Sequence, residues 1–577
     1  MDFFLTFVFF NSFFQRIFVP LYLFIMMVEL LLIPLLFVSF AGWGVWAKML
    51  IGNKTESFSL TLLLGFSFFG ISTCLLSFFT PLNPDVELSL LIISIIPFFF
   101  KNLRVCIVRF PKEILKSVWF WIFCLIIVSA GSLYPFRPDH FSYYVPTLNW
   151  LNQFGLITGV ADIDWNLGQM SVFHIMQAGL DQTIDPFRRL GVFMTVVFLI
   201  YLFERKSWLL LFAVPFYFLF IQTPSPDVAI VFLSLITVNE LCFNYKVDNY
   251  KILLLISVFV FTIKPVAFWL PFWVFIAGLY RNKKKLKDFR IYLIPALLII
   301  IYLIKNMIAS STLFYPVTFT KLNTYWLPDL RILELSGQKA DMFTFKYQFT
   351  EAEINAMSLF QKIYYWLTIN KLQTIINCLT VIIIIAFGIF SFSKKNFLYR
   401  SLWVIIVIKS AVVFGFSGQY RFMLDGMYPL LLIMLYPVRI GKTKISAAGL
   451  SFFLLFLILI GYPPLLKRSI PKFKLTTWMT GFTKESLIIP GQTDIKNYGT
   501  AKMGNLNFNF TPLLYNFDTP PPAFTYRTLK FYYDLGVFPQ MKDSCDIRKG
   551  FYMKTLDSEE KENLWKIIET CFMLPHK

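Results

Sequence analysis

The chain has 577 residues, of which 57% are hydrophobic, 19% aromatic and only 15% charged. About a quarter of the residues of a soluble domain are charged, so this composition excludes an ordinary soluble enzyme. Runs of about 18 or more apolar residues are typical of transmembrane helices, and such runs recur from end to end of the chain. The sequence therefore predicts an all-α integral membrane protein. The formal net charge of +20 does not indicate a nucleic-acid partner, because the cations cluster in connectors such as RNKKKLKDFR between apolar runs.

About 12–14 membrane spans are predicted from the apolar segments, and the shortest segments set the range. The segments begin near Val19, Phe58, Val86, Ile114, Leu190, Ser207, Val228, Ile252, Val266, Ile291, Leu372, Leu402, Phe422 and Ile445.

The loops between these spans alternate between rich in Lys and Arg and free of both. PLNPDVE and QTPSPD contain neither residue, whereas RNKKKLKDFR is dense in them. By the positive-inside rule the basic loops face the cytoplasm. We therefore expect both chain termini to lie outside the cytoplasm.

Three long polar segments fall on the predicted external side. They are a first loop at 134–189, a second loop at 305–371 and a tail at 467–577. The chain is thus divided into a transmembrane domain at 1–466 and a small extracytoplasmic carboxyl-terminal segment. The tail holds Cys545 and Cys571, for which an external location makes a disulfide an expectation.

The first external loop opens with YPFRPDHFSYYVPTLNWLN, from Tyr134 to Asn152. Pro138 favours the end of the preceding span, and Asp139 then stands at a natural helix N-cap. Apolar residues follow at helical spacing, and a second amphipathic piece reads QMSVFHIMQAGL. The pattern predicts two interfacial helices, with Trp150 at the level of the lipid headgroups. In the second loop, Thr350 and Glu353 form a capping box before a helical run.

Cations occur at the external boundary, where the positive-inside rule makes them scarce, and converging cations would bind a phosphate or diphosphate. Asp139 beside such a cluster indicates group transfer from a lipid phosphate. The carboxylate would either deprotonate an acceptor hydroxyl or hold a divalent cation. The candidate catalytic residues are Asp139 and His140. The candidate substrate-binding residues are Arg137, Tyr143, Asp164, Lys264, Lys305 and Arg421.

Two acidic residues fall inside predicted spans, where ionisable groups are functional suspects by default. Glu29 has no evident partner, whereas Asp425 lies four residues after Arg421. An i,i+4 ion pair between Arg421 and Asp425 is the simpler expectation.

Three external stretches carry a resemblance to a known family. The loop RPDHFSYYVPTLNWLNQFGLITGVADIDWNLGQMSVFH resembles the first external loop of GT-C membrane glycosyltransferases, and more closely that of a bacterial group of GT-C-like membrane proteins. KNMIASSTLFYP, from Lys305 to Pro316, and QYRFMLDGMYPLLL, from Gln419 to Leu432, resemble two later patterns of that group. Together these motifs cover roughly Val19 to Tyr462 in the expected order.

The resemblance implies a GT-C-like arrangement of helices in a bacterial inner (cytoplasmic) membrane. It further implies transfer of a sugar from a polyprenyl-phosphate donor to a glycan, lipid or protein acceptor, with Asp139 as base or metal ligand. The cofactor it allows is a divalent cation, Mg²⁺ or Mn²⁺. The chain departs from the pattern twice, because no second acidic residue adjoins Asp139 and no basic residue stands near Trp165 and Asn166.

Other functions stay open at this stage. A flippase of lipid-linked glycans would need polar residues along a path through the bilayer and internal repeats. An O-antigen polymerase or ligase would depend on paired external arginines rather than on a loop aspartate. A non-catalytic assembly protein is the remaining alternative.

Overall fold

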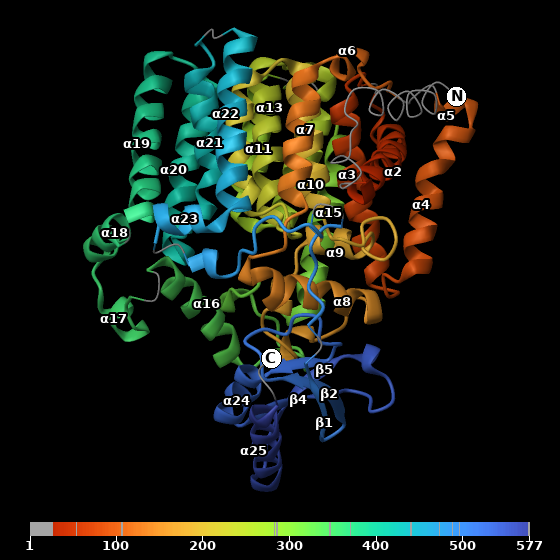
Figure 1. Ribbon diagram of the computed structural model, residues 1–577, viewed down its shortest axis with the longest axis vertical. Helices are drawn as coiled ribbons and strands as arrows, with labels where there is room; N and C mark the ends of the chain where they lie inside the picture. Colours follow the sequence, from red (N-terminus) through yellow and green to blue (C-terminus); the bar gives the residue numbers. More distant parts are fainter. Residues whose placement is uncertain are drawn as a thin grey trace.

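The computed structural model describes residues 27–574 apart from 54, 105–107, 282, 284–286, 346–347, 370, 439–440, 472–473, 487–488 and 496. It is a mainly helical bundle, with a carboxyl-terminal unit that contains strands at one end (Figure 1). The start of the span predicted near Val19 and the side chain of Glu29 lie outside the described residues.

Seven of the described helices are long and apolar enough to cross a membrane, which confirms a helical membrane protein. They are α2 (Met27–Ile51), α3 (Phe58–Ser77), α11 (Pro226–Phe243), α15 (Arg290–Ser310), α19 (Lys371–Ser393), α20 (Phe397–Ser417) and α22 (Lys442–Gly461).

Shorter elements occupy the places of the other predicted spans. They are α4 (Pro84–Phe99), α7 (Val118–Gly131), α10 (Leu190–Arg205), η5 (Trp208–Ala213) with η6 (Pro215–Leu219), α12 (Tyr250–Ile263), η8 (Pro265–Ala267) with α13 (Trp269–Arg281), and α21 (Leu424–Leu435). Pro215 and Pro265 each begin a 3-10 turn at a break between elements, since proline cannot continue a helix from the preceding turn. The total of about 12–14 spans stays a prediction.

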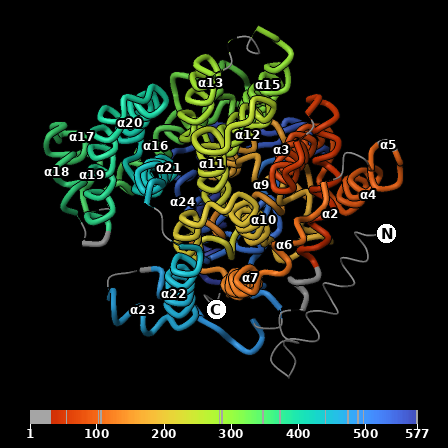
Figure 2. The backbone as a smooth tube through the Cα atoms, turned by 90° about the horizontal axis from the view of Figure 1, so that it is seen from above, coloured from red at the N-terminus to blue at the C-terminus, as the bar shows by residue number. Residues whose placement is uncertain are grey.

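The central helices of the bundle are buried, and the outer helices expose apolar side chains. Seen from above, α10, α11 and α12 lie between α2–α4 on one side and α19 and α20 on the other (Figure 2). The most apolar stretch of α11 is 89% buried, against 33% for α19 and 28% for α20. Apolar side chains such as Ile389, 70% exposed on α19, thus stand where lipid would cover them.

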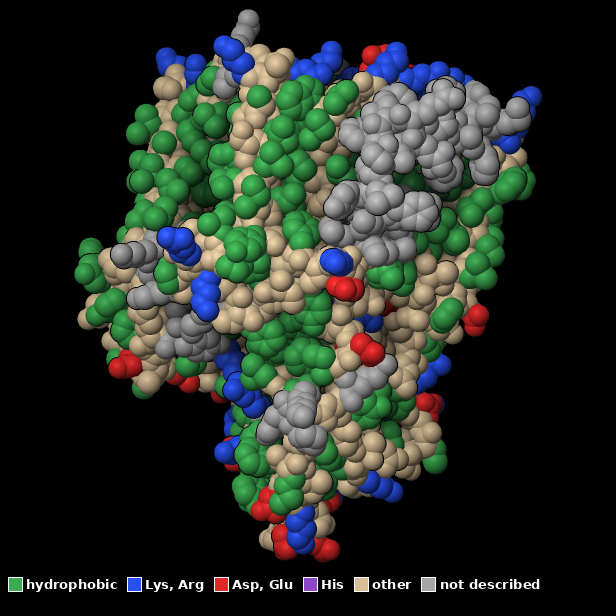
Figure 3. All heavy atoms as spheres, in the orientation of Figure 1, with side chains coloured by type: hydrophobic (Ala, Val, Ile, Leu, Met, Phe, Trp, Pro, Cys, Tyr) green, Lys and Arg blue, Asp and Glu red, His purple; other side chains and the backbone are tan. Residues whose placement is uncertain are grey.

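Basic side chains are concentrated at one end of the molecule, whereas basic and acidic side chains are mixed at the other (Figure 3). In Figure 3 the Lys and Arg side chains gather along the upper rim, the end where Figure 1 places α5 (Lys101–Arg104) and α6 (Lys112–Leu115). The carboxyl-terminal strands lie at the opposite end. The predicted alternation of basic and non-basic loops agrees with this arrangement, and which end faces the cytoplasm stays a prediction.

The first external loop forms helices at the predicted places, but they are not interfacial. It folds as η2 (His140–Tyr144), α8 (Val145–Phe154), η3 (Val160–Asp162), η4 (Leu167–Gln169) and α9 (Val172–Ala178). The apolar stripes are buried within the protein, and Trp150, 1% exposed, packs on Phe154 and Phe551 instead of reaching the headgroups. The stripes were predicted to face membrane or protein, and they face protein: α9 packs on α3 and α8, and Trp150 of α8 packs on the carboxyl-terminal unit.

The second external loop is also helical. After η9 (Thr318–Thr320) come α16 (Leu330–Thr344), α17 (Glu351–Ala356) and α18 (Leu359–Thr368). The capping box of Thr350 and Glu353 is confirmed, because Thr350 Oγ1 accepts from the Glu353 N–H and Glu353 accepts from the Thr350 N–H.

The tail begins with α23 (Pro463–Ser469) and η11 (Lys474–Thr477) and then folds into a small α/β unit. Its elements are β1 (Gly499–Met503), β2 (Leu506–Thr511), β3 (Ala523–Thr525), α24 (Tyr526–Leu535), β4 (Val537–Met541), η12 (Ile547–Lys549), β5 (Phe551–Thr555) and α25 (Ser558–Met573). β2 pairs antiparallel with β1 and parallel with β3, and β4 pairs antiparallel with β5. The strands were not predicted. The expected disulfide is absent, since Cys545 is exposed and free while Cys571 is buried and free.

This unit docks on the first external loop through backbone and side-chain bonds. The Phe551 N–H donates to the Thr158 carbonyl at 3.0 Å, and the Tyr532 hydroxyl donates to the Asp162 carbonyl at 2.7 Å. Arg188 of the loop lies 3.9 Å from the Asp518 carboxylate. The docked unit therefore closes one side of the space in front of Asp139.

Candidate functional site

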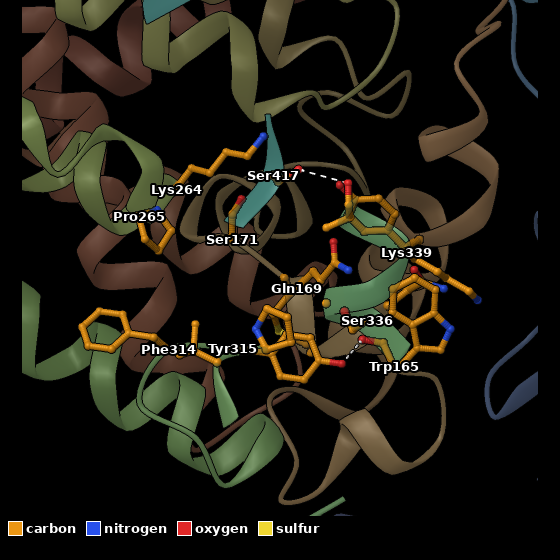
Figure 4. Close-up of a pocket in the computed structure, with 18 of the residues that line it drawn as sticks. Trp165, Gln169, Ser171, Lys264, Pro265, Phe314, Tyr315, Ser336, Lys339 and Ser417 are labelled. Atoms are coloured by element: carbon orange, nitrogen blue, oxygen red, sulfur yellow. Dashed lines mark hydrogen bonds between the residues drawn. The ribbon is translucent and has the colours of Figure 1, made fainter. Parts of the chain in front are cut away.

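A cavity of about 1410 Å³ lies between the external ends of the helices and the carboxyl-terminal unit. Its walls come from the first and second external loops, the start of α13, the end of α20 and the segment 514–528 (Figure 4). Asp139, Tyr143, Asp164, Lys264, Lys305 and Arg421 all line it, so most of the predicted site residues do converge. Arg137 and His140 are not part of the lining.

Asp139 stands at the N-cap of η2, but its side chain makes no capping bond there. Instead, Arg421 Nη1 donates to Asp139 Oδ2 at 2.9 Å, and Arg137 Nη2 lies 3.6 Å from the same oxygen. Burial by itself would raise the pKa of this carboxyl, yet the charges of Arg421 and Arg137 outweigh it and hold the pKa below its ordinary value. Asp139 is therefore ionised at neutral pH.

Arg421 does not form the predicted i,i+4 pair. It points to Asp139, and Gln419 Oε1 accepts a second bond from its Nε at 3.1 Å. Asp425 pairs instead with Lys409 of α20 and accepts from Trp269 Nε1 at 2.7 Å. The i,i+4 expectation was wrong because η10 (Tyr420–Phe422) interrupts the helix between the two residues.

Arg137 supports Asp139 from behind the cavity. Its guanidinium lies over the Phe220 ring, 4.3 Å from the ring centroid, so the ring covers one face of the guanidinium. Its place is that of a residue that orients the carboxylate, rather than of one that contacts a ligand.

A second ion pair joins Lys264, which was predicted as a site residue, to Asp227, which was not. Lys264 Nζ lies 2.8 Å from Asp227 Oδ1, and Asp227 Oδ2 has no hydrogen-bond partner in the structure. The charge of Asp227 also acts on the Asp139 carboxyl, although Asp227 itself is not part of the lining. Asp227 thus supplies in space the second carboxylate that does not adjoin Asp139 in sequence. The loop QTPSPD offered one signal for it, an acid directly after Pro226 at the start of α11.

Lys305 is a buried cation without a counter-ion. Lys305 is 1% exposed, and its ammonium donates to the Met170 carbonyl at 2.5 Å and lies 5.3 Å from the Tyr302 ring centroid. No salt bridge joins it to any residue of the described chain. Burial of an unpaired charge is costly, so the ammonium suits a site that an anion occupies.

The two histidines of the loop differ in their access to the cavity. His140 is 3% exposed with its ring against Phe141, and burial keeps its pKa well below the ordinary value, so it is neutral and away from the lining. Its predicted catalytic contact with substrate does not fit this position. His174, which was not predicted, does line the cavity.

The proton of the neutral His174 ring lies on Nε2, an atom that is buried beside the cavity. The Ser171 N–H donates to His174 Nδ1, so the ring proton of the neutral form sits on Nε2. Burial lowers the pKa of His174 to about 3, which keeps the ring neutral. Nε2 has no hydrogen-bond partner among the described residues.

Asp164 and Asp162 of the loop also differ in their access to the cavity. Asp164 lines the cavity and accepts from the N–H and the side-chain amide of Asn166, both at 2.9 Å. Burial raises its pKa to about 6. Asp162 is fully buried beneath the loop and lies outside the lining. The basic residue missing near Trp165 in sequence comes from α16, because Lys339 Nζ lies 4.6 Å from the Trp165 ring centroid.

The residues around Asp139 do not fit a divalent cation. Both guanidinium groups occupy the Oδ2 side of its carboxylate, and Lys264 lies next to the second acid. Within the described residues no group of three His, Cys, Asp or Glu side chains is placed to hold a metal ion. The cluster instead presents cations to an anion.

The family model for a domain of unknown function, DUF8201, matches residues 26–428. The chain belongs to this family. The matched region holds the first and second external loops and ends just after Arg421 and Asp425, so all the predicted site residues fall within it. No curated protein and no solved structure matches the chain. The carboxyl-terminal unit, which closes one wall of the cavity, lies beyond the matched region.

Proposed function

We propose that this member of the DUF8201 family is a membrane glycosyltransferase. It moves a sugar from a polyprenyl-phosphate-linked donor to an acceptor on the extracytoplasmic face. The observation that carries the proposal is an ionised Asp139 in a large cavity that also holds Arg421, Lys264 and Lys305, three cations from distant parts of the chain.

The polar end of the cavity suits a phosphate. The ammonium groups of Lys264 and Lys305 and the Nε2–H of His174 are donors that a phosphate oxygen accepts well. Lys305 has no carboxylate to satisfy it, so an anionic ligand would remove the cost of its burial.

The apolar flank of the cavity suits a lipid tail. Phe272 of α13 is 63% exposed and Phe416 of α20 is 59% exposed, and both belong to the lining. Both phenylalanines line the same cavity as Lys264 and Arg421, so a charged headgroup and an apolar chain would share one space. A lipid phosphate has this combination of charge and chain, whereas a soluble nucleotide sugar does not.

The chemistry then follows from Asp139. The carboxylate accepts the proton of an acceptor hydroxyl while that oxygen forms a bond to the anomeric carbon of the sugar. The bond between the anomeric carbon and the phosphate oxygen breaks, and the phosphate leaves with the bonding electrons toward the cations. Since the pKa of Asp139 is low, it is a weak base before reaction, and proton transfer accompanies bond formation rather than preceding it.

The test is transfer by the purified protein in lipid nanodiscs, supplied with labelled polyprenyl-phosphate sugars and an acceptor extract. Asp139→Asn should lose at least about 100-fold in rate, the lower range for loss of a general base. Glu562→Gln, which changes an exposed acid of α25 outside the cavity, should keep full activity. Full activity of Asp139→Asn, or absence of any bound polyprenyl lipid by native mass spectrometry, would overturn the proposal.

One observation favours a second candidate function, a polymerase or ligase that depends on external arginines. Arg137 and Arg421 both face the Asp139 carboxylate, so the pair of cations that such an enzyme would use is present. Alanine substitutions separate the two functions. Loss of transfer with Asp139→Ala favours the glycosyltransferase, whereas loss only with Arg137→Ala and Arg421→Ala favours the second.

A further inference from the structure

A second group of cations lines the cavity away from Asp139. Lys339 comes from α16 and Arg527 from α24, the first helix of the carboxyl-terminal unit. In Figure 4 Lys339 and Trp165 lie at one side of the cavity, and Lys264 and Pro265 lie at the other. Lys264, proposed to bind the phosphate of the donor, and Lys339 of the second group therefore lie at different sides of the same cavity.

Neither cation of the second group has an acidic partner. No salt bridge or hydrogen bond joins the side chain of Lys339 or of Arg527 to any residue that the structure describes. Burial lowers the pKa of Lys339, and the charge of Arg527 lowers it further, so the two positive groups are close enough to repel each other. The Asp164 carboxylate acts on Lys339 more strongly than Arg527 does and raises its pKa, although it does not reach salt-bridge distance. A bound anion would bring a second negative charge to the two cations.

The aromatic wall beside these cations is held rigidly. The Tyr315 hydroxyl donates to the Trp165 carbonyl at 2.7 Å, and the Lys339 ammonium lies 4.6 Å from the Trp165 ring centroid. Gly168 is required under Tyr315, because a Cβ there would lie 2.7 Å from Tyr315 Cζ. The Tyr315 bond thus holds the backbone of Trp165, and the Lys339 ammonium lies over the indole without a ligand.

We propose that Trp165, Lys339 and Arg527 form a subsite for a negatively charged sugar of the acceptor. The inference rests on the proposed function, since it assigns the acceptor of the same reaction. A carboxylate or phosphate on the sugar pairs with the two cations, and the sugar ring lies against the indole. Tyr515, Arg527 and Asp139 all line the same cavity. A sugar held here can present a hydroxyl toward Asp139.

The carboxyl-terminal unit contributes residues to the proposed subsite. It supplies Arg527 and Tyr515, whereas Trp165 and Lys339 come from the two external loops. The acceptor subsite is therefore complete only when the unit is docked.

The experiment measures binding to the full-length protein in nanodiscs of neutral lipid by titration calorimetry. The probes are methyl glucoside, glucuronate, glucose 6-phosphate and inorganic phosphate. The two anionic sugars should bind at least about tenfold tighter than methyl glucoside, and tighter than inorganic phosphate. Lys339→Gln and Arg527→Gln should each weaken their binding about tenfold, the factor that corresponds to about 1.4 kcal/mol.

Three variants serve as controls. Lys530→Gln removes a charge one turn along α24 from Arg527, outside the lining, and should change nothing. Lys339→Arg and Arg527→Lys keep the charge and should restore most of the affinity, which a role in folding alone would not require. Equal binding of neutral and anionic sugars, or unchanged binding in the glutamine variants, overturns the proposal. Binding of inorganic phosphate as tight as that of glucose 6-phosphate overturns the assignment to a sugar.

Failure of the subsite and failure of the proposed function are distinguishable. Asp139→Asn should keep the binding of glucuronate and glucose 6-phosphate while it loses transfer. Charge-selective binding without transfer by the wild type would refute the glycosyltransferase and leave the subsite in place. Transfer that is unaffected by Lys339→Gln and Arg527→Gln would refute the subsite and leave the enzyme in place.

Discussion

Asp139 and Arg421 lie 282 positions apart in the chain and form the central contact of the site. Arg421 was identified from the sequence as a cation at the external boundary, where the positive-inside rule makes cations scarce, and Asp139 from its place in the first external loop and the family resemblance. The sequence did not reveal that the two residues pair with each other. It predicted an i,i+4 pair of Arg421 with Asp425, which was wrong. A charge at a helix end can be satisfied by any element that the fold brings near it, and local spacing does not reveal which one.

The pairing predicts an unusual pH dependence of stability in Arg421→Gln. In the wild type the pKa of Asp139 is below its ordinary value, so its stabilising charge is present above about pH 4 and is lost only below that. Without Arg421, burial dominates and the pKa rises. The folded variant then binds a proton that the unfolded chain does not, so its stability increases as the pH falls from 7 to 5.

Thermal unfolding in one detergent at the two pH values measures this effect. The difference in melting temperature between wild type and Arg421→Gln should shrink at pH 5. The double variant Asp139→Asn with Arg421→Gln should show no such change, because no carboxyl remains to titrate. A constant difference for Arg421→Gln would contradict the assigned pairing. Arg331→Gln, which breaks an exposed pair with Asp329, is the matched control.

At the scale of the elements, glycines set how closely the amino-terminal helices approach. A Cβ on Gly42 of α2 would lie 1.7 Å from the Ser94 carbonyl oxygen of α4, and one on Gly65 of α3 would lie 1.8 Å from the Phe40 carbonyl oxygen of α2. Small residues at such crossings let membrane helices pack backbone to backbone. The spans themselves were predictable from hydrophobicity, and these crossings were not.

Gly42→Ala should therefore destabilise the protein by about 1–3 kcal/mol, the usual cost of overpacking. Gly415→Ala on α20 has open space around the new methyl group and should be neutral, or stabilising by up to about 1 kcal/mol through helix propensity. Thermal melts of the two variants in the same detergent give the comparison. Equal stability of both would show that α2 and α4 are not packed as described.

At the scale of the whole molecule, the carboxyl-terminal unit turns an open external face into a cavity. The first loop meets it through Gly159, which has a φ of +73° and lies against β5. A Cβ there would lie 2.7 Å from the Phe551 carbonyl oxygen, so only glycine satisfies both the left-handed backbone and the close approach. This junction connects the loop that carries Asp139 to the unit that carries Arg527.

Gly159→Ala should loosen the docked unit. Gly52 has a similar φ of +62° but nothing within 4 Å of a new methyl group, so Gly52→Ala carries the backbone strain alone. Limited proteolysis should release fragments of the region 499–574 faster from Gly159→Ala than from Gly52→Ala. Equal rates of release would mean that the junction does not hold the unit in place.

The membrane class, the uneven distribution of basic loops and the helical external loops could be predicted from the sequence, and six of the eight candidate site residues do line the cavity. These features follow from composition and local spacing, which act over a few turns of chain. Only the tertiary structure decided that the helices of the first loop are buried rather than interfacial, that Asp227 and Lys339 supply charges missing near Asp139 and Trp165, and that Arg421 serves Asp139. These outcomes depend on contacts between segments hundreds of residues apart, and a buried charge takes whichever partner the packed chain places beside it.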